Sequence, residues 1–257
     1  MGGNATKHFG TSRVNHEEYT HIVSFIEQLT HDLNAHITRS WKKESYGDVD
    51  VVFSCANDRE KFVERLQHNY LVSPREIVKN GKCISLAMNY KNTKVQVDCI
   101  HNAVHSFVNW FDYGDMAMLI GRIIPYQLKF AMGGLYLRNN KLGDDVLITQ
   151  DFHEALEFLG FNVNWFIGGF DSQYEMLNWI GFSKYFNNFG LVNNDRSTQK
   201  MRCDVVRESL KFEIDYLLQM FENKKFDKEK LQPFKVELNK KVKLAKQKRQ
   251  FKNDIKK

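Results

Sequence analysis

The segment Gly-Asp-Val-Asp-Val-Val-Phe, from Gly47 to Phe53, constrains the fold more than any other stretch of the chain. Its β-branched and aromatic residues favour a strand. Because successive side chains of a strand point to opposite faces, Asp48 and Asp50 point to the same face. The segment therefore predicts a strand that brings two carboxylates together without any further requirement on the fold.

Helix signals stand on both sides of this strand. The segment Asn15-x-x-Glu18 has the form of a capping box, and apolar residues at helical spacing follow it to about position 34. A second run with helical spacing begins at Asn57-x-x-Glu60. We therefore predict one helix before the strand and another directly after it.

Three strand-like runs follow, at about 71–78, 83–89 and 93–100. Gly81-Lys82 and Lys91-Asn92 separate them and supply short turns, which predicts an antiparallel meander. The order helix, strand, helix and strands is typical of an α+β domain. The predicted fold class is therefore α+β, a mixed sheet with helices on one face.

The C-terminal half is expected to be mixed and mostly helical. Helical spacing runs from about 105 to 130, and two short strands are expected at 135–137 and 146–148. Asp151-x-x-Glu154 predicts the start of a further helix, and residues 171–222 have a mainly helical pattern. We expect this half to form a region distinct from the sheet.

The predicted elements and the charge distribution divide the chain into three regions: 1–104 with the predicted sheet, 105–222 with the mixed region, and a basic tail at 223–257. The tail holds 14 Lys/Arg against 4 Asp/Glu, and the rest of the chain holds 23 against 27. Such a tail can hold a phosphate backbone, with a solvated helix as the open alternative. The tail residues expected to contact nucleic acid are Lys240, Lys241, Lys243, Lys246, Lys248, Arg249 and Lys252.

Several classes of protein are excluded or disfavoured by the sequence. No apolar run approaches the ~18 residues that a membrane span needs, so we expect a cytoplasmic protein without a membrane partner. The 4 cysteines form no Cys-x-x-Cys pair, which disfavours a zinc site and favours reduced, buried thiols. The glycine-rich patterns of P-loop and Rossmann nucleotide sites are missing.

A third acidic residue, Asp98, stands in the apolar strand-like run Lys94–Ile100. If this strand neighbours the one that holds Asp48 and Asp50, the three carboxylates form one cluster, and their mutual repulsion calls for a cation. Ligand sets made only of oxygen select Mg²⁺ or Mn²⁺ over zinc. Two such ions close together serve in-line phosphoryl transfer especially well.

These residues resemble the signature of the DNA polymerase beta-like nucleotidyltransferase superfamily. Gly47, Asp48, Asp50 and Asp98 match its Gly-Asp-x-Asp segment and its third aspartate on a later strand, and Lys43-Glu44-Ser45 resembles the lead-in of the polymerase X branch. The resemblance implies a polymerase beta-like palm. It also implies Asp48, Asp50 and Asp98 as catalytic metal ligands, two Mg²⁺ or Mn²⁺ ions and an NTP substrate.

The chain departs from the superfamily at a Gly-Ser pair that helps to hold the triphosphate, where it has Ile37-Thr38. The resemblance then implies that Thr38, assisted by Arg39 and Ser40, takes over the contacts to the nucleotide. Lys43 and Gly47 complete the expected nucleotide-binding segment. The loss of the glycine leaves open whether the chain retains full activity.

A second resemblance concerns the aromatic segment Phe107–Asp115. Trp110 and Phe111 resemble the aromatic pair of a polymerase X turn that packs under the incoming nucleotide, with Gly114 as the turn glycine. The residues from 129 to 161 resemble the thumb of the same enzymes. Ordinary aromatic packing in the core is the alternative interpretation of these residues.

The function implied is transfer of a nucleoside monophosphate from an NTP to an acceptor hydroxyl, with release of pyrophosphate. The basic tail favours a nucleic-acid 3′ end, of tRNA or DNA, as the acceptor. One alternative is nucleotidylation of a small molecule or a protein. Another is a nucleotide- or nucleic-acid-binding protein that has lost catalysis, which the missing Gly-Ser pair keeps open.

Overall fold

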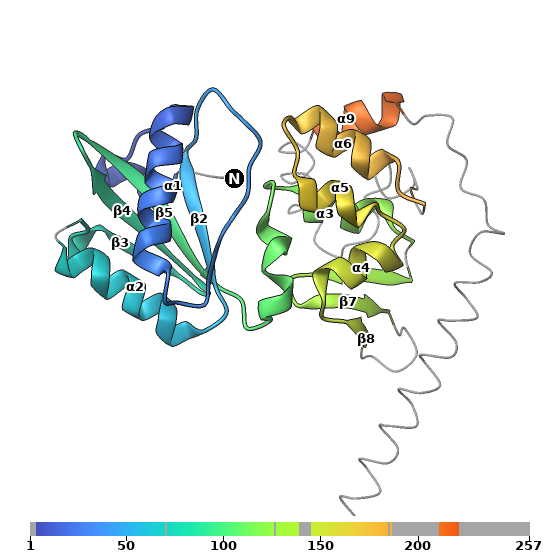
Figure 1. The fold of residues 1–257 in the computed structure, drawn as a ribbon, viewed down its shortest axis with the longest axis horizontal. Coiled ribbons are helices and arrows are strands. Elements are labelled where there is room, and N and C mark those ends of the chain that lie inside the picture. Colours follow the sequence, from blue (N-terminus) through green and yellow to red (C-terminus); the bar gives the residue numbers. More distant parts are fainter. Residues whose placement is uncertain are drawn as a thin grey trace, which may run out of the picture. The chain divides into compact units, whose positions relative to one another are not determined.

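The computed structural model describes residues 4–69, 71–125, 127–138, 145–184, 186 and 211–220. Figure 1 shows the ribbon of the chain. The chain divides into two compact units, and each is described separately below. The first unit comprises Met1–Ala117 and Asn164–Met176, and the second comprises Met118–Val163 and Leu177–Lys257.

The first unit is built on a mixed sheet of five strands in the order β1-β2-β5-β4-β3. Strand β2 runs parallel to its neighbour β5, and the other neighbouring pairs are antiparallel. The α+β class and the meander of the last three strands are therefore confirmed. The strands are β1 (Ala35–Ile37), β2 (Asp48–Phe53), β3 (Ile77–Asn80), β4 (Cys83–Tyr90) and β5 (Thr93–His101).

Two helices, α1 (His16–Thr30) and α2 (Ala56–His68), pack on one face of this sheet (Figure 1). Alternate strand residues point to this face and form the core with the apolar stripes of both helices. The main core residues are Ile22, Ile26, Val49, Val51, Phe53, Phe62, Leu66, Leu86, Val95, Val97 and Cys99. The residues between them, Asp48, Asp50, Gln96 and Asp98 among them, consequently point to the opposite face.

The predicted helix starts are confirmed in part. The Asn15 side chain accepts a hydrogen bond from the Glu18 backbone N–H, and the Glu18 carboxylate accepts one from the Asn15 N–H, so the capping box of α1 is complete. The expected start of α2 at Asn57 is wrong by two positions, because Cys55 is the N-cap residue and Asn57 lies inside the first turn. Before α4 (Phe152–Phe158), Asp151 caps as predicted.

Two predicted elements are corrected. The run expected as a strand from about 71 becomes a strand only at Ile77, because Ser73 caps a short 3₁₀ helix, η2 (Pro74–Glu76). The helix expected over 105–130 is three elements: a 3₁₀ helix η3 (His105–Phe111), α3 (Met116–Ile123) and strand β6 (Leu128–Ala131). Tyr113 and Gly114 adopt positive φ values between the first two, and Pro125 follows the end of α3.

The second unit contains a small antiparallel sheet in the order β6-β7-β8, where β7 is Gly134–Leu137 and β8 is Val146–Thr149. The two strands expected at 135–137 and 146–148 are thus present. The sequence did not indicate β6, because apolar residues at helical spacing predicted a helix over this segment. The remaining elements in the described part of the chain are η1 (Lys7–Phe9), α5 (Val163–Gly168), α6 (Gln173–Gly181) and α9 (Lys211–Met220).

Three cysteines, Cys55, Cys83 and Cys99, lie in the described part of the chain, and all three are free thiols. The fourth, Cys203, and the tail lysines predicted to contact nucleic acid lie outside the described residues. A search of the described helices for one long and apolar enough to cross a membrane finds none.

Candidate metal centre

The three predicted carboxylates meet on the sheet face that α1 and α2 leave uncovered. Asp50 on β2 is the register partner of Asp98 on the parallel strand β5, and Asp48 precedes Asp50 by two residues. Each side chain offers an oxygen, and these oxygens all lie within 4.8 Å of one another. The alternation of side chains along β2 places Asp48 and Asp50 on one face, and the parallel pairing of β2 with β5 brings Asp98 beside them.

The electrostatics of this cluster would favour a bound cation. Burial, followed by the charges of Asp48 and Asp98, raises the pKa of Asp50 from 3.8 to about 7. The cluster therefore holds a proton near neutral pH that a bound cation would displace. Three partly exposed carboxylates form a hard, all-oxygen donor set, which fits Mg²⁺ or Mn²⁺.

Gln96 is a neighbour of the carboxylates that the sequence did not reveal. It precedes Asp98 by two residues on β5, is the register partner of Asp48 and has only 2% of its surface exposed. Its Nε2 donates to both carboxylate oxygens of Asp98, at 3.1 Å and 2.9 Å. Its Oε1 accepts from the backbone N–H and the hydroxyl of Thr6, at 3.1 Å and 3.0 Å.

The predicted nucleotide-binding residues Thr38, Arg39 and Ser40 line one pocket of about 410 Å³. The backbone N–H of Thr38 donates to the Asp50 carbonyl at 3.0 Å. The Thr38 end of the pocket therefore lies beside the strand that carries Asp48 and Asp50. The hydroxyl of Ser40 is buried, and no group in the described part of the chain hydrogen bonds to it. The other lining residues are Tyr19, Val23, Glu27, Ile37, Tyr113, Ile167, Gly168 and Gly169.

Arg39 is held by groups of the protein itself. Its Nε donates to Oδ2 of Asp112 at 2.9 Å, and its Nη1 donates to the Phe166 carbonyl at 3.1 Å. The guanidinium also lies over the rings of Phe166 and Tyr113, at 4.4 Å and 5.2 Å from their centroids. These interactions fix the turn that carries Thr38 and Ser40, so Arg39 positions the pocket.

Asp112, which the sequence left unassigned, is the centre of this arrangement and is fully buried. It also accepts hydrogen bonds from Nε2 of His36 at 2.7 Å, from Nδ2 of Asn109 at 2.9 Å and from the backbone N–H of Arg39 at 2.9 Å. Burial alone would raise the pKa of Asp112, but the hydrogen bond and charge of His36 outweigh burial, together with the hydrogen bonds from Asn109 and the Arg39 backbone, and lower this pKa.

Lys43 and Gly47 lie in the segment that leads into β2. Nζ of Lys43 stands 4.8 Å from the ring centroid of Trp41 and 5.8 Å from that of Tyr46. Burial lowers the pKa of Lys43, while the charges of Asp48 and Asp50 oppose that decrease, so this ammonium group lies within the field of the carboxylates. Gly47 directly precedes the first residue of β2.

The aromatic pair Trp110 and Phe111 belongs to η3. The Trp110 ring stacks on Phe107 with centroids 6.3 Å apart. The aromatic residue of the following turn that lines the pocket is Tyr113, whose ring packs against Phe166 and Phe170. Tyr113 has a φ of 57°, and its hydroxyl accepts a hydrogen bond from the backbone N–H of Phe170.

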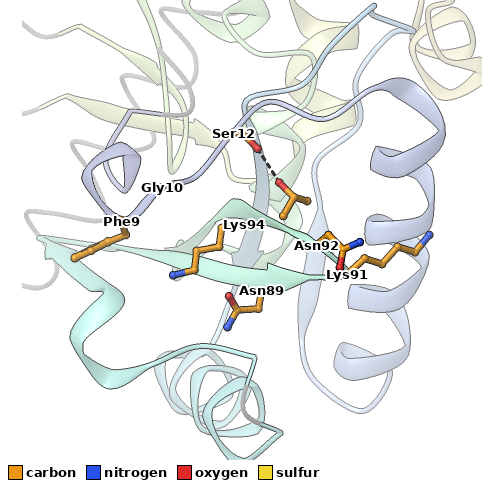
Figure 2. A pocket seen from close by; sticks show the side chains of 8 residues that line it. Phe9, Gly10, Ser12, Asn89, Lys91, Asn92 and Lys94 are labelled. Atoms are coloured by element: carbon orange, nitrogen blue, oxygen red, sulfur yellow. Dashed lines mark hydrogen bonds between the residues drawn. The ribbon is translucent and has the colours of Figure 1, made fainter.

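A second pocket, open and polar, lies at the turn between β4 and β5 (Figure 2). It has a volume of about 600 Å³, and the side chain of Lys94 in its wall pairs with Glu76. Its lining residues are Phe9, Gly10, Ser12, Asn89, Lys91, Asn92, Thr93 and Lys94. No function was predicted for these residues from the sequence.

Comparisons with known proteins give no family for the chain. No protein-family model matches it, and no curated protein matches it significantly in sequence. A functional assignment therefore depends on the residues and geometry of the site.

Proposed function

We propose that the protein is a metal-dependent nucleotidyltransferase, which transfers a nucleoside monophosphate from an NTP to an acceptor hydroxyl and releases pyrophosphate. The observation that carries this proposal is the convergence of Asp48, Asp50 and Asp98 on one sheet face. An all-oxygen cluster of this kind suits divalent ions, and paired divalent ions suit in-line displacement at phosphorus.

In the proposed reaction, the acceptor oxygen forms a bond to the α-phosphorus while the bond from that phosphorus to the bridging oxygen of the leaving pyrophosphate breaks. Asp48 and Asp50 would hold two ions, and Asp98 would join them at the ion nearer the acceptor. Bound divalent ions lower the pKa of the attacking hydroxyl and neutralise charge on the triphosphate. The contribution of the chain is to position these groups.

The pocket beside β1 is the proposed place of the nucleotide. The Ser40 hydroxyl is buried without a partner in the described part of the chain, which makes it a candidate donor to a phosphate oxygen. Thr38 adds a second hydroxyl at the pocket, and Lys43 adds a positive charge near Asp48. Arg39 would support the turn and not contact a phosphate directly, because Asp112 and the Phe166 carbonyl accept hydrogen bonds from its guanidinium.

The proposed acceptor is a nucleic-acid 3′ end. The support for this choice is the charge distribution, with 14 Lys/Arg against 4 Asp/Glu from residue 223 onward. An acidic body that carries a carboxylate site repels a polyanion, so a basic anchor elsewhere in the chain would be needed to retain it.

The proposal is tested with the purified full-length protein, Mg²⁺, each α-labelled NTP and a mixture of total RNA and DNA oligonucleotides. We expect label transfer by the wild type and its loss in Asp50→Asn. The matched control is Asp171→Asn, the same change at an exposed aspartate, which should retain transfer. Transfer by Asp50→Asn at the wild-type rate would reject the site.

A further inference from the structure

The N-terminal segment is connected to the carboxylate cluster through a single buried side chain. Thr6 and Gln96 are 90 positions apart, and both are almost fully buried. The backbone N–H of Ser12 donates to the carbonyl of Lys94 at 3.0 Å, which lays this segment along β5. Gln96 thus lies between the segment and Asp98.

Hydrogen-bond chemistry fixes which way the Gln96 carboxamide faces. A backbone N–H can only donate, so the group that faces the Thr6 N–H at 3.1 Å must be the carboxamide oxygen. The NH₂ group must then face Asp98, whose ionised carboxylate can only accept. A flipped carboxamide would place two donors against each other at Thr6 and two acceptors against each other at Asp98.

This orientation has a consequence for Asp98. Each carboxylate oxygen has about two lone-pair directions, and the NH₂ group of Gln96 approaches both oxygens from one side. The carboxylate keeps its charge and its remaining lone pairs, but it loses the freedom to rotate about its terminal bond. A ligand that is oriented before binding loses less entropy when it binds a cation.

We propose that Gln96 is a positioning residue of the metal centre, and that Thr6 supports it from the N-terminal segment. The expected effect of Gln96 on nucleotide transfer rests on the proposed function, whereas its expected effect on cation binding does not. Residues that orient a metal ligand from behind typically change metal affinity or activity by about 10- to 100-fold when they are replaced.

The decisive variant is Gln96→Met, which keeps the length of the side chain and removes its donor and acceptor. Mn²⁺ binding to the full-length protein is measured by titration calorimetry, and the Mg²⁺ concentration for half-maximal transfer is measured in parallel. We expect both constants to rise by about 10- to 100-fold. KM for the NTP at saturating Mg²⁺ should remain unchanged.

Three further variants complete the test. Thr6→Val removes one of the two donors to Oε1 and should weaken Mn²⁺ binding less than Gln96→Met, so it replaces that variant if Gln96→Met fails to fold. Thr6→Val should also add nothing when it is combined with Gln96→Met, because the two residues act through one hydrogen-bonded chain. Gln28→Met, the same change on the exposed surface of α1, is the control.

The outcomes separate the inference from the proposed function. Weaker Mn²⁺ binding by Gln96→Met supports the positioning role even if no variant and no wild-type sample transfers a nucleotide. A lower melting temperature with unchanged Mn²⁺ affinity would mean that Gln96 only stabilises the fold, and the inference would be overturned. Unchanged Mn²⁺ affinity in both Thr6→Val and a folded Gln96→Met would overturn it equally.

Discussion

The metal-free protein is predicted to lose stability as the pH rises, because of Asp50. Burial and the charges of Asp48 and Asp98 raise its pKa from 3.8 to about 7. The folded protein therefore holds this proton more tightly than the unfolded chain, and the resulting stabilisation, complete below about pH 4, is lost as the pH rises to about 7. Since one pKa unit corresponds to about 1.36 kcal/mol, the loss reaches about 4 kcal/mol. This is an upper value, because solvent still reaches the side chain and screens its neighbours.

The assay is urea denaturation in EDTA between about pH 4 and pH 8, with the wild type and Asp50→Asn compared at each pH. Titrating groups outside the cluster affect both proteins alike, so the difference between the two unfolding free energies isolates Asp50 together with its coupling to Asp48 and Asp98. We expect the variant to gain stability relative to the wild type as the pH rises, and Asp171→Asn to follow the wild type. Added Mg²⁺ should stabilise the wild type at high pH and not Asp50→Asn. Parallel curves for the wild type and Asp50→Asn would refute this explanation of the cluster.

Three further predictions concern the pocket and the tail. Asp112→Asn should cost about 1.5–3 kcal/mol in urea denaturation, because Arg39 and His36 lose the buried carboxylate to which they donate. Asp32→Asn, at the surface pair with Arg65, should cost under about 1 kcal/mol. Equal costs would contradict the buried network. Ser40→Ala should raise KM for the NTP several-fold. The unfolding free energy should stay unchanged or rise slightly, because the buried Ser40 hydroxyl has no partner in the described residues to lose. An unchanged KM would place the phosphate-binding groups elsewhere. Truncation after Asn223 should flatten the slope of log affinity for oligonucleotides against log salt by several units. Each phosphate that the tail no longer neutralises contributes about 0.7–0.9 to that slope. An unchanged slope with a lower melting temperature would mean that the tail only packs on the body.

The acidic cluster was predictable because its signals are local. A period of two residues puts Asp48 and Asp50 on one face, and the apolar run around Asp98 indicates a strand. The antiparallel meander followed from two short turns. The parallel pairing of β2 with β5, which brings Asp98 opposite Asp50, could only be assumed, because no local pattern states which strands become neighbours.

The groups that the sequence did not reveal act over long distances in the chain. Asp112 binds Arg39 across 73 positions, and Gln96 binds Thr6 across 90. A buried aspartate and a surface aspartate have the same appearance in a sequence, since only the fold supplies the partners. The predicted helix over 105–130 failed for a related reason. Apolar residues at helical spacing also fit the short β6 strand, and the positive φ of Tyr113 has no sequence signal of its own.

Anomalous scattering from crystals grown with Mn²⁺ and a non-hydrolysable NTP analogue would locate the metal and the nucleotide together. We predict one or two Mn²⁺ peaks bound to carboxylate oxygens of Asp48, Asp50 and Asp98, with two ions about 3.5–4 Å apart when the nucleotide is present. We also predict the nucleotide in the pocket lined by Thr38 and Ser40. Mn²⁺ bound elsewhere, or no Mn²⁺ at these carboxylates in crystals that hold the nucleotide, would contradict the proposed metal centre.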